Sequence, residues 1–171
     1  MSALIRPARP DDLAAVVALT EQWAQEPTTT GNYQFNSVEQ LRQWLGPYFL
    51  VAEMVAQEEP LSSIVGFLVA RVGEHDDGDM ISQVAQEGET YLTLGQLYVH
   101  PDHRQRGIGS LLVAGLRSAA QEQGISCIEV LSMNVDWPRT IGFYERQGFR
   151  RWYFTMFTGS STEERRRAST G

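Results

Sequence analysis

The chain contains no lysine, and arginine supplies all 14 of its basic side chains. Its 21 acidic residues outnumber them, which leaves a formal net charge of −7 at pH 7. Nucleic-acid phosphates are bound by basic surfaces, so a protein with a net negative charge is poorly suited to bind nucleic acid. We therefore expect no nucleic acid among its partners.

Cysteine is almost as scarce, because Cys127 is the only one in 171 residues. A single cysteine excludes an internal disulfide and fits the reducing conditions of the cytoplasm. It lies in the apolar segment 125–131, which predicts a buried thiol rather than a nucleophile. No apolar run approaches the length of a membrane span, and the N-terminus lacks the layout of a signal peptide. We expect a cytoplasmic protein without a membrane partner.

Length and composition predict one domain over residues 1–158 and a polar tail over 159–171. Hydrophobic periodicity predicts strands at 4–8, 48–56, 64–72, 90–99, 126–133 and 149–157, and helices at 10–25, 37–45, 107–123 and 138–147. Gly95 indicates a bulge in its strand, Ser37 a helix N-cap, and Gly124 the end of a helix. The order β-α-α-β-β-β-α-β-α-β predicts an α/β (α+β) sandwich with a mixed central sheet.

The most informative segment is 94–112, in which a strand ends at Pro101 and Arg104–Gly109 opens an amphipathic helix. Such a turn aims several backbone N–H groups at one point, at the positive end of the helix dipole, and predicts a pyrophosphate site. The segment lacks the glycine spacing of a dinucleotide fold and the Lys-Ser/Thr of a P-loop. A plain strand–turn–helix joint and another kind of nucleotide-binding module remain alternatives on this evidence.

Two motifs carry a resemblance to a known family. Val99-His100-Pro101 followed by Arg104-x-x-Gly107-x-Gly109 resembles the acyl-CoA-binding signature of the GCN5-related N-acetyltransferase (GNAT) superfamily. About forty residues on, the segment 134–149 resembles the family's later helix, with its Phe-Tyr pair and a following Gly-Phe. The resemblance covers nearly the whole domain and implies a three-layer sandwich with a mostly antiparallel central sheet.

The resemblance also implies an activity. The chain is expected to transfer an acetyl group from acetyl-CoA, its cosubstrate, to a primary amine by direct attack in a ternary complex, without a metal ion. The acceptor would be a small-molecule amine or a protein amine, with a cationic amine as one option, and a homodimer would fit the family. The alternative is a non-catalytic acyl-CoA-binding sensor with the same fold.

The resemblance assigns roles residue by residue. Leu97 would offer its backbone N–H to the thioester oxygen, and Tyr144 would protonate the leaving thiolate as general acid. The cofactor-binding residues would be Leu97, Tyr98, Val99, Arg104, Gln105, Arg106, Gly107, Ile108, Gly109, Ser110, Asn134 and Tyr144.

The sequence departs from the family at the general base. Thr93 occupies the strand position at which histone-type enzymes carry a glutamate, and a threonine cannot serve as the base. Glu89, at the start of the same strand, is the nearest carboxylate and is the predicted base. His100 and His103 lie further along, and a relay through ordered water is an equal alternative.

Two further features are left open by the sequence. Trp137 stands where the family usually has an asparagine, which puts one cofactor contact in doubt and leaves a stacking or wall role. The segment 73–89 carries six acidic residues and no arginine. It is either a solvated surface loop or an electrostatic funnel for a cationic amine.

Overall fold

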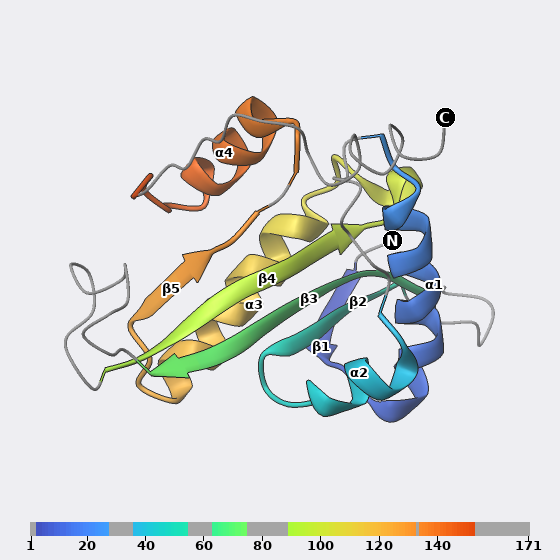
Figure 1. Ribbon diagram of the computed structural model, residues 1–171, viewed down its shortest axis with the longest axis horizontal. Helices are drawn as coiled ribbons and strands as arrows, with labels where there is room; N and C mark the ends of the chain where they lie inside the picture. Colours follow the sequence, from blue (N-terminus) through green and yellow to red (C-terminus); the bar gives the residue numbers. More distant parts are fainter. Residues whose placement is uncertain (1–2, 28–35, 55–62, 75–88, 133, 153–171) are drawn as a thin grey trace, which may run out of the picture.

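The protein forms a five-stranded sheet with helices on both faces (Figure 1). The computed structural model describes residues 3–27, 36–54, 63–74, 89–132 and 134–152. In chain order the elements are β1 (Ala3–Pro7), the 3-10 turn η1 (Pro10–Asp12), α1 (Leu13–Ala24), α2 (Val38–Gln43), β2 (Phe49–Met54), β3 (Ser63–Glu74), β4 (Thr90–Val99), the 3-10 turn η3 (Pro101–His103), α3 (Ile108–Glu122), β5 (Cys127–Val130) and α4 (Trp137–Arg146).

The sheet has the strand order β1-β2-β3-β4-β5. The first four strands are antiparallel to their neighbours, and β5 is parallel to β4, so the expected mixed, mostly antiparallel sheet is confirmed. The expected order of elements is confirmed through α4. Of the expected last strand, 149–157, residues 149–152 form no strand and the rest lie outside the described residues, as do the tail and segment 75–88.

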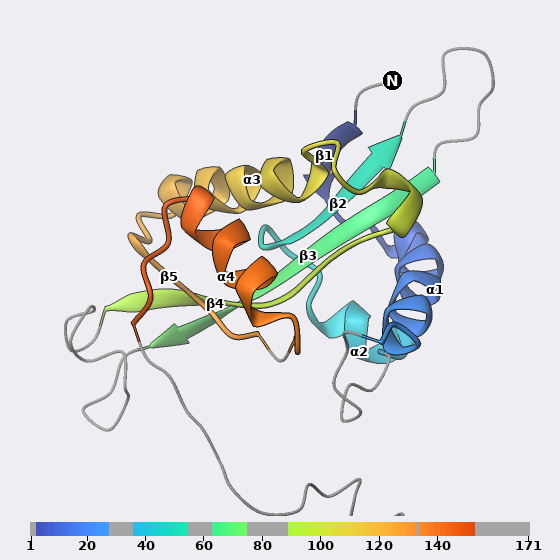
Figure 2. The same ribbon diagram turned by 90° about the horizontal axis from the view of Figure 1, so that it is seen from above.

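Two hydrophobic layers hold the helices to the sheet, because alternate residues of each strand point to opposite faces. On one face, Leu68 and Leu92 pack against Leu112 and Leu116 of α3. On the other face, α1 and α2 cover a layer that includes Phe67 and Tyr98. Figure 2 shows α3 on one side of the sheet and α1 with α2 on the other. Among the described helices, none is both long and apolar enough to cross a membrane.

Cys127 departs from the expectation of a buried thiol. It lies in β5, the last strand of the described sheet, and its side chain is only half-buried. A strand at the side of a sheet has no neighbour to cover it there, which is why the apolar run does not lead to full burial. Partial burial, followed by the nearby Glu89 and Glu129, raises the pKa of the thiol and keeps it in its neutral form.

An ion-pair network fixes the start of α1 against the first two strands. The Arg6 guanidinium donates to both oxygens of Asp12, at 2.7 and 2.8 Å, and to Glu53 of β2. Asp12 also accepts from the backbone N–H of Arg9 at 2.7 Å, and its side chain is 10% exposed. The hydrogen bonds from Arg6 hold the pKa of the Asp12 carboxyl below its usual value.

Replacing Asp12 with asparagine is expected to lower the free energy of unfolding by about 2 kcal/mol, because Arg6 loses a charged partner. A lowered carboxyl pKa stabilises the protein above the unfolded-state value of about 4, and this stabilisation is lost as the pH falls through the folded-state pKa. The difference between wild type and Asp12→Asn in urea denaturation should therefore shrink between pH 7 and pH 3. Asp11→Asn, in the same turn but exposed, is the control; an equal loss in both variants would contradict this assignment.

Candidate functional site

The site begins where β4 and β5 separate. The two strands pair from Tyr91 opposite Cys127 to Leu94 opposite Val130, and the last bond between them runs from Leu131 N–H to the Leu94 carbonyl at 3.2 Å. Beyond Leu94, no described strand pairs with β4 on that side. In Figure 1, β4 continues toward α1, whereas the segment after β5 turns away toward α4.

A bulge at Gly95 turns the backbone of β4 at the point of separation. The register with β3 jumps from Gln96 to Leu94, leaving Gly95 without an opposite residue, which confirms the expected bulge. Leu94 directs its carbonyl to β5, whereas His100 directs its N–H to Val65 of β3. In a regular strand the backbone N–H and carbonyl groups of these two residues would point to the same side of the strand. The bulge therefore reverses the direction of these backbone groups for the residues that follow it.

The reversal leaves polar backbone groups of β4 directed into the gap. With His100 bonded to β3, alternation directs the N–H and carbonyl of Leu97 and Val99 toward the open side. On that side the Val99 carbonyl accepts a hydrogen bond from Arg104 Nε at 2.8 Å, which confirms the direction of this carbonyl. The Leu97 N–H thus faces the gap beyond the end of the β4–β5 pairing.

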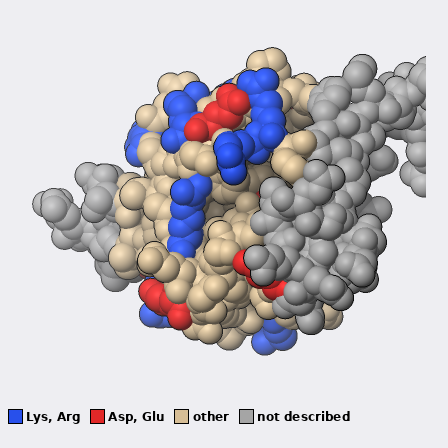
Figure 3. All heavy atoms as spheres, turned by 90° about the vertical axis from the view of Figure 1, so that its left-hand side faces the viewer, with Lys and Arg blue, Asp and Glu red and all other residues tan. Residues whose placement is uncertain are grey.

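A cleft of about 940 Å³ occupies the gap. It is lined by Leu94–Val99 of β4, by the turn that leads into α3, by Leu131, Ser132 and Asn134 after β5, and by one side of α4. Four arginines and two acidic residues line it, although the whole chain is acidic: Arg71, Arg104, Arg139 and Arg146, against Glu26 and Asp136. Figure 3 shows arginine side chains gathered around an acidic group on the face that includes α4. This local excess of positive charge favours an anionic ligand.

The turn before α3 presents free N–H groups to the cleft. Gln105 and Gly107 have positive φ angles, 60° and 80°, and the first helical bond is donated by Leu111 to Gly107. The N–H groups of residues 108–110 therefore have no partner within the helix, as expected at a helix N-terminus. Gly107 is required for its backbone conformation, since a Cβ there would meet nothing within 4 Å.

Gly109 has a packing role that the sequence did not indicate. A Cβ on this residue would lie 3.4 Å from the ring of Phe143. The missing side chain thus lets α4 approach the first turn of α3, and Gly109 acts through helix packing. The predicted contact of its backbone N–H with an anion is compatible with this, because that N–H is among the free ones.

Arg104 is held by the protein rather than free in the cleft. Its guanidinium pairs with Glu26 at 2.5 Å and lies 5.2 Å from the centre of the Tyr98 ring. The Tyr98 hydroxyl donates to the same carboxylate at 2.8 Å, and burial together with that carboxylate raises the Tyr98 pKa. Arg104 thus connects the end of α1 to the turn, and Glu26 is one of the cleft-lining residues that the sequence did not indicate.

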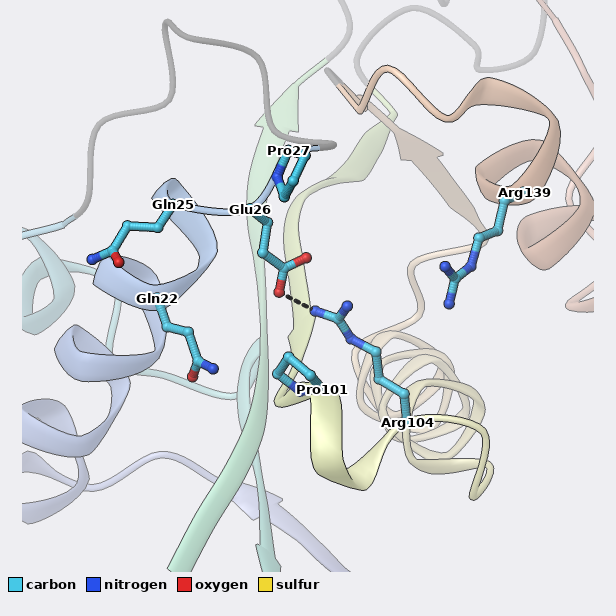
Figure 4. A pocket seen from close by; sticks show the side chains of 7 residues that line it. All are labelled: Gln22, Gln25, Glu26, Pro27, Pro101, Arg104 and Arg139. Atoms are coloured by element: carbon cyan, nitrogen blue, oxygen red, sulfur yellow. Dashed lines mark hydrogen bonds and ion pairs between the residues drawn. The ribbon is translucent and has the colours of Figure 1, made fainter.

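A smaller hollow of about 460 Å³ borders this ion pair. Figure 4 shows Arg139 reaching from α4 toward the hollow, across from the pair of Glu26 and Arg104. Arg139 and the predicted Arg106 are both exposed, and Arg139 also lines the main cleft. His103 lines the cleft as well, and its Nδ1 atom is buried without a hydrogen-bond partner among the described residues. A ligand at this end would supply that partner.

Tyr144 reaches the cleft from α4. Its ring packs edge-on against Phe143 and Phe149, with centroids 5.0 and 5.5 Å away. Burial raises the pKa of the phenol above its usual value of about 10, so the hydroxyl stays protonated at neutral pH. No hydrogen bond to this hydroxyl is found among the described residues, and it remains available to a ligand in the cleft.

Side chains of the residues just before α4 cap its first turn. Asn134 Oδ1 accepts from the Asp136 N–H at 2.7 Å, and Asp136 in turn accepts from the Arg139 N–H as the helix N-cap. Asn134 also lines the cleft. Trp137, the first residue of α4, is 43% exposed and is not among the residues that line the cleft.

The predicted base lies away from the cleft. Glu89 precedes β4, eight residues before Leu97, which corresponds to about 26 Å along a strand. Its carboxylate accepts from Ser126 Oγ at 2.8 Å, and it is not among the lining residues. Thr93 instead donates to Glu129 of β5 at 2.6 Å. A carboxylate on the neighbouring strand therefore stands beside the position at which the family carries its glutamate. The sequence of β4 alone does not indicate Glu129, because this residue lies 36 positions further along the chain.

Comparison with known proteins identifies the class. The family described as the acetyltransferase (GNAT) family matches residues 17–149. The chain belongs to this family, and the resemblance drawn from its two motifs is confirmed. Comparison with curated protein sequences gives no match.

Solved structures share the fold at low sequence identity. A transcriptional regulator from Bacillus halodurans is 22% identical with a TM-score of 0.65, over 92% of this chain and 99% of that one. An aminoglycoside acetyltransferase from an uncultured soil metagenomic sample is 18% identical with a TM-score of 0.63, over 93% and 97%. The NatC complex bound to Gag peptide and CoA contains a chain that is 19% identical with a TM-score of 0.67, over 90% and 87%.

The two left-handed glycines that flank α3 provide a test of backbone strain. Gly107→Ala and Gly124→Ala both place an alanine at positive φ, 80° and 72°, with open space around the new Cβ. Each should lower the free energy of unfolding by about 1 to 2 kcal/mol through conformational strain alone. Urea denaturation of the two variants measures this cost. A much larger loss for Gly107→Ala would show that packing, and not φ, requires the glycine.

Proposed function

We propose that the protein is an N-acetyltransferase that transfers the acetyl group of acetyl-CoA to a primary amine within a ternary complex. The observation that carries the proposal is the arrangement of the cleft. One wall is the unpaired half of β4, one end is the N-terminus of α3, and Tyr144 stands on the opposite wall. This combination suits a ligand that has phosphates at one end and an extended amide chain behind them.

The described residues fit acetyl-CoA. The free N–H groups of residues 108–110, with those of Gln105 to Gly107, would bind the pyrophosphate, and Arg106 and Arg139 would add charge. The backbone of Leu97 and Val99 would pair with the pantetheine amides. Arg104 would act mainly through Glu26, by fixing the turn, and the unpartnered His103 Nδ1 gives the same end one more polar contact.

The transfer itself is a direct displacement. The amine nitrogen forms a bond to the acetyl carbon, and the bond from that carbon to sulfur breaks. The N–H of Leu97 stabilises the negative charge that develops on the carbonyl oxygen. The hydroxyl of Tyr144 gives its proton to the departing thiolate. Burial raises the pKa of the phenol, so the hydroxyl carries its proton when the thiolate departs, and the same shift makes it a weaker acid than a free tyrosine.

The amine must lose a proton before it attacks, since a primary ammonium has a pKa of about 10.4. Of the acidic residues that line the cleft, Glu26 is paired with Arg104 and Asp136 accepts from the Arg139 N–H. Glu129 and the predicted Glu89 are the carboxylates beside β4, and neither is among the lining residues. We favour Glu129, because it is paired with Thr93, one residue before the cleft-lining Leu94. It would accept the proton through water that connects it to the cleft, and Glu89 would act over a longer path.

The proposal is tested by binding and turnover together. Acetyl-CoA at 100 times its Kd should stabilise the protein by about 2.7 kcal/mol in a thermal-shift assay, whereas NAD and ATP should not. Tyr144→Phe should keep this shift but lower kcat for CoA release with an amine panel by about 100-fold. Tyr48→Phe, a half-buried tyrosine outside the cleft, should leave both unchanged.

Other outcomes separate the alternatives. Stabilisation by acetyl-CoA without CoA release from any amine would support an acyl-CoA-binding sensor. Stabilisation by NAD or ATP alone would indicate a nucleotide-binding module and overturn the proposal. Loss of the acetyl-CoA shift in Gly107→Ala, with the shift retained in Gly124→Ala, would locate binding at the turn before α3.

The base is tested by a matched pair of glutamine variants. Glu129→Gln should lower kcat by about 10- to 100-fold at pH 7, and the loss should diminish as the pH rises toward the pKa of the amine, where free amine is abundant. Glu89→Gln should retain wild-type kcat across the same pH profile. A loss in Glu89→Gln alone would restore Glu89 as the base, and wild-type rates in both variants would assign the proton to a water relay.

A further inference from the structure

Arg71 marks the end of the cleft farthest from the turn before α3. It lies on β3, opposite Thr93 of β4, next to the point at which pairing with β5 ends. It lines the cleft. From Thr93 to Val99 the strand spans about 20 Å. A ligand whose phosphates bind at the turn before α3 would therefore place its thioester between the two ends, and Arg71 would face the space beyond it.

The charge of Arg71 is not neutralised by the described part of the protein. Its guanidinium lies 6.0 Å from the centre of the Trp44 ring, and the side chain is exposed. No described carboxylate lies within ion-pair distance of it, in contrast to Arg104, which is paired with Glu26. A guanidinium remains charged at every relevant pH and presents a planar fork that matches a carboxylate.

The ring of Trp44 restricts where this fork can point. Trp44 directly follows α2, on the side of the sheet away from α3. The guanidinium lies over this ring and forms no ion pair with Glu129, which lies two strands across in the same row of the sheet, opposite Thr93. The row therefore presents a positive group at one side and a negative group at the other, about 10 Å apart at the backbone.

We propose that Arg71 binds an acidic group of the acceptor, so that the substrate is a primary amine that also carries a carboxylate, as amino acids and acidic peptides do. This inference rests on the proposed acetyl transfer and identifies its acceptor class. A free arginine beside the acceptor repels a polycationic amine and attracts an anionic one. The acidic group would fix the acceptor while its amine faces the thioester.

The test compares amino acids with their α-carboxamides, which keep the amine but lack the negative charge. Rates of CoA release are expressed per free amine, because the amide also lowers the pKa of the amine. The acidic form should be the better acceptor by at least 10-fold in kcat/KM. Arg71→Gln should raise KM for the carboxylate form by about 10- to 100-fold, with little change in kcat, and should abolish the preference over the amide.

The controls distinguish recognition from folding and from cofactor binding. Arg42→Gln removes an exposed arginine of α2 outside the cleft and should behave as wild type. Arg71→Gln should retain the wild-type Tm and the wild-type KM for acetyl-CoA, and Arg71→Lys should recover part of the preference. A preference for diamines or carboxamides, or an unchanged KM in Arg71→Gln, would overturn the inference while leaving acetyl transfer intact. Absence of CoA release with every amine would instead overturn the proposed function itself.

Discussion

The bulge at Gly95 is the constraint on which the site depends. A regular β4 would direct Leu97 and Val99 toward β3, and the backbone groups that now face the cleft would be consumed by the sheet. One extra residue reverses this direction, and it does so where pairing with β5 ends. The bulge therefore decides which residues form this wall of the gap, since in a regular strand Gln96 and Tyr98 would present their backbone groups there in place of Leu97 and Val99. Glycine suits this position because it leaves no side chain in the gap.

Ion pairing, rather than the total number of charges, decides which charged side chains of this protein are neutralised. The chain as a whole is acidic, yet arginines outnumber acidic residues along the cleft. Glu26 neutralises Arg104 and draws Tyr98 into the same cluster, so that this arginine serves the architecture of the turn. Arg71 and Arg139 have no such partner in the described structure, and our proposals assign both to ligands. The distinction between a structural and a recognising arginine is thus made by the neighbouring elements and not by the residue itself.

The sequence predicted the parts of the fold and site that are local. Strand and helix periodicity, the bulge at Gly95, the N-cap at Ser37 and the positive-φ glycine at Gly124 all follow from short-range rules, and the structure has each of them. Contacts between distant segments could not be predicted in this way. Glu26 meets Arg104 across 78 positions, and Glu129 meets Thr93 across 36. The prediction of Glu89 as base rests on proximity along β4 and takes no account of Glu129 on the strand beside it.

The unpaired half of β4 also has a consequence for solubility. A strand that offers free N–H and carbonyl groups is a template to which strands of other molecules can add, which is a common route to aggregation. Here the exposed groups lie inside a cleft, with Tyr144 and the rest of α4 on its opposite wall and Arg104 already bonded to the Val99 carbonyl. Tyr144, the rest of α4 and Arg104 thus stand on the side of β4 to which a further strand would have to add. The enclosure that shapes the cleft thus also protects the protein from adding strands of its neighbours.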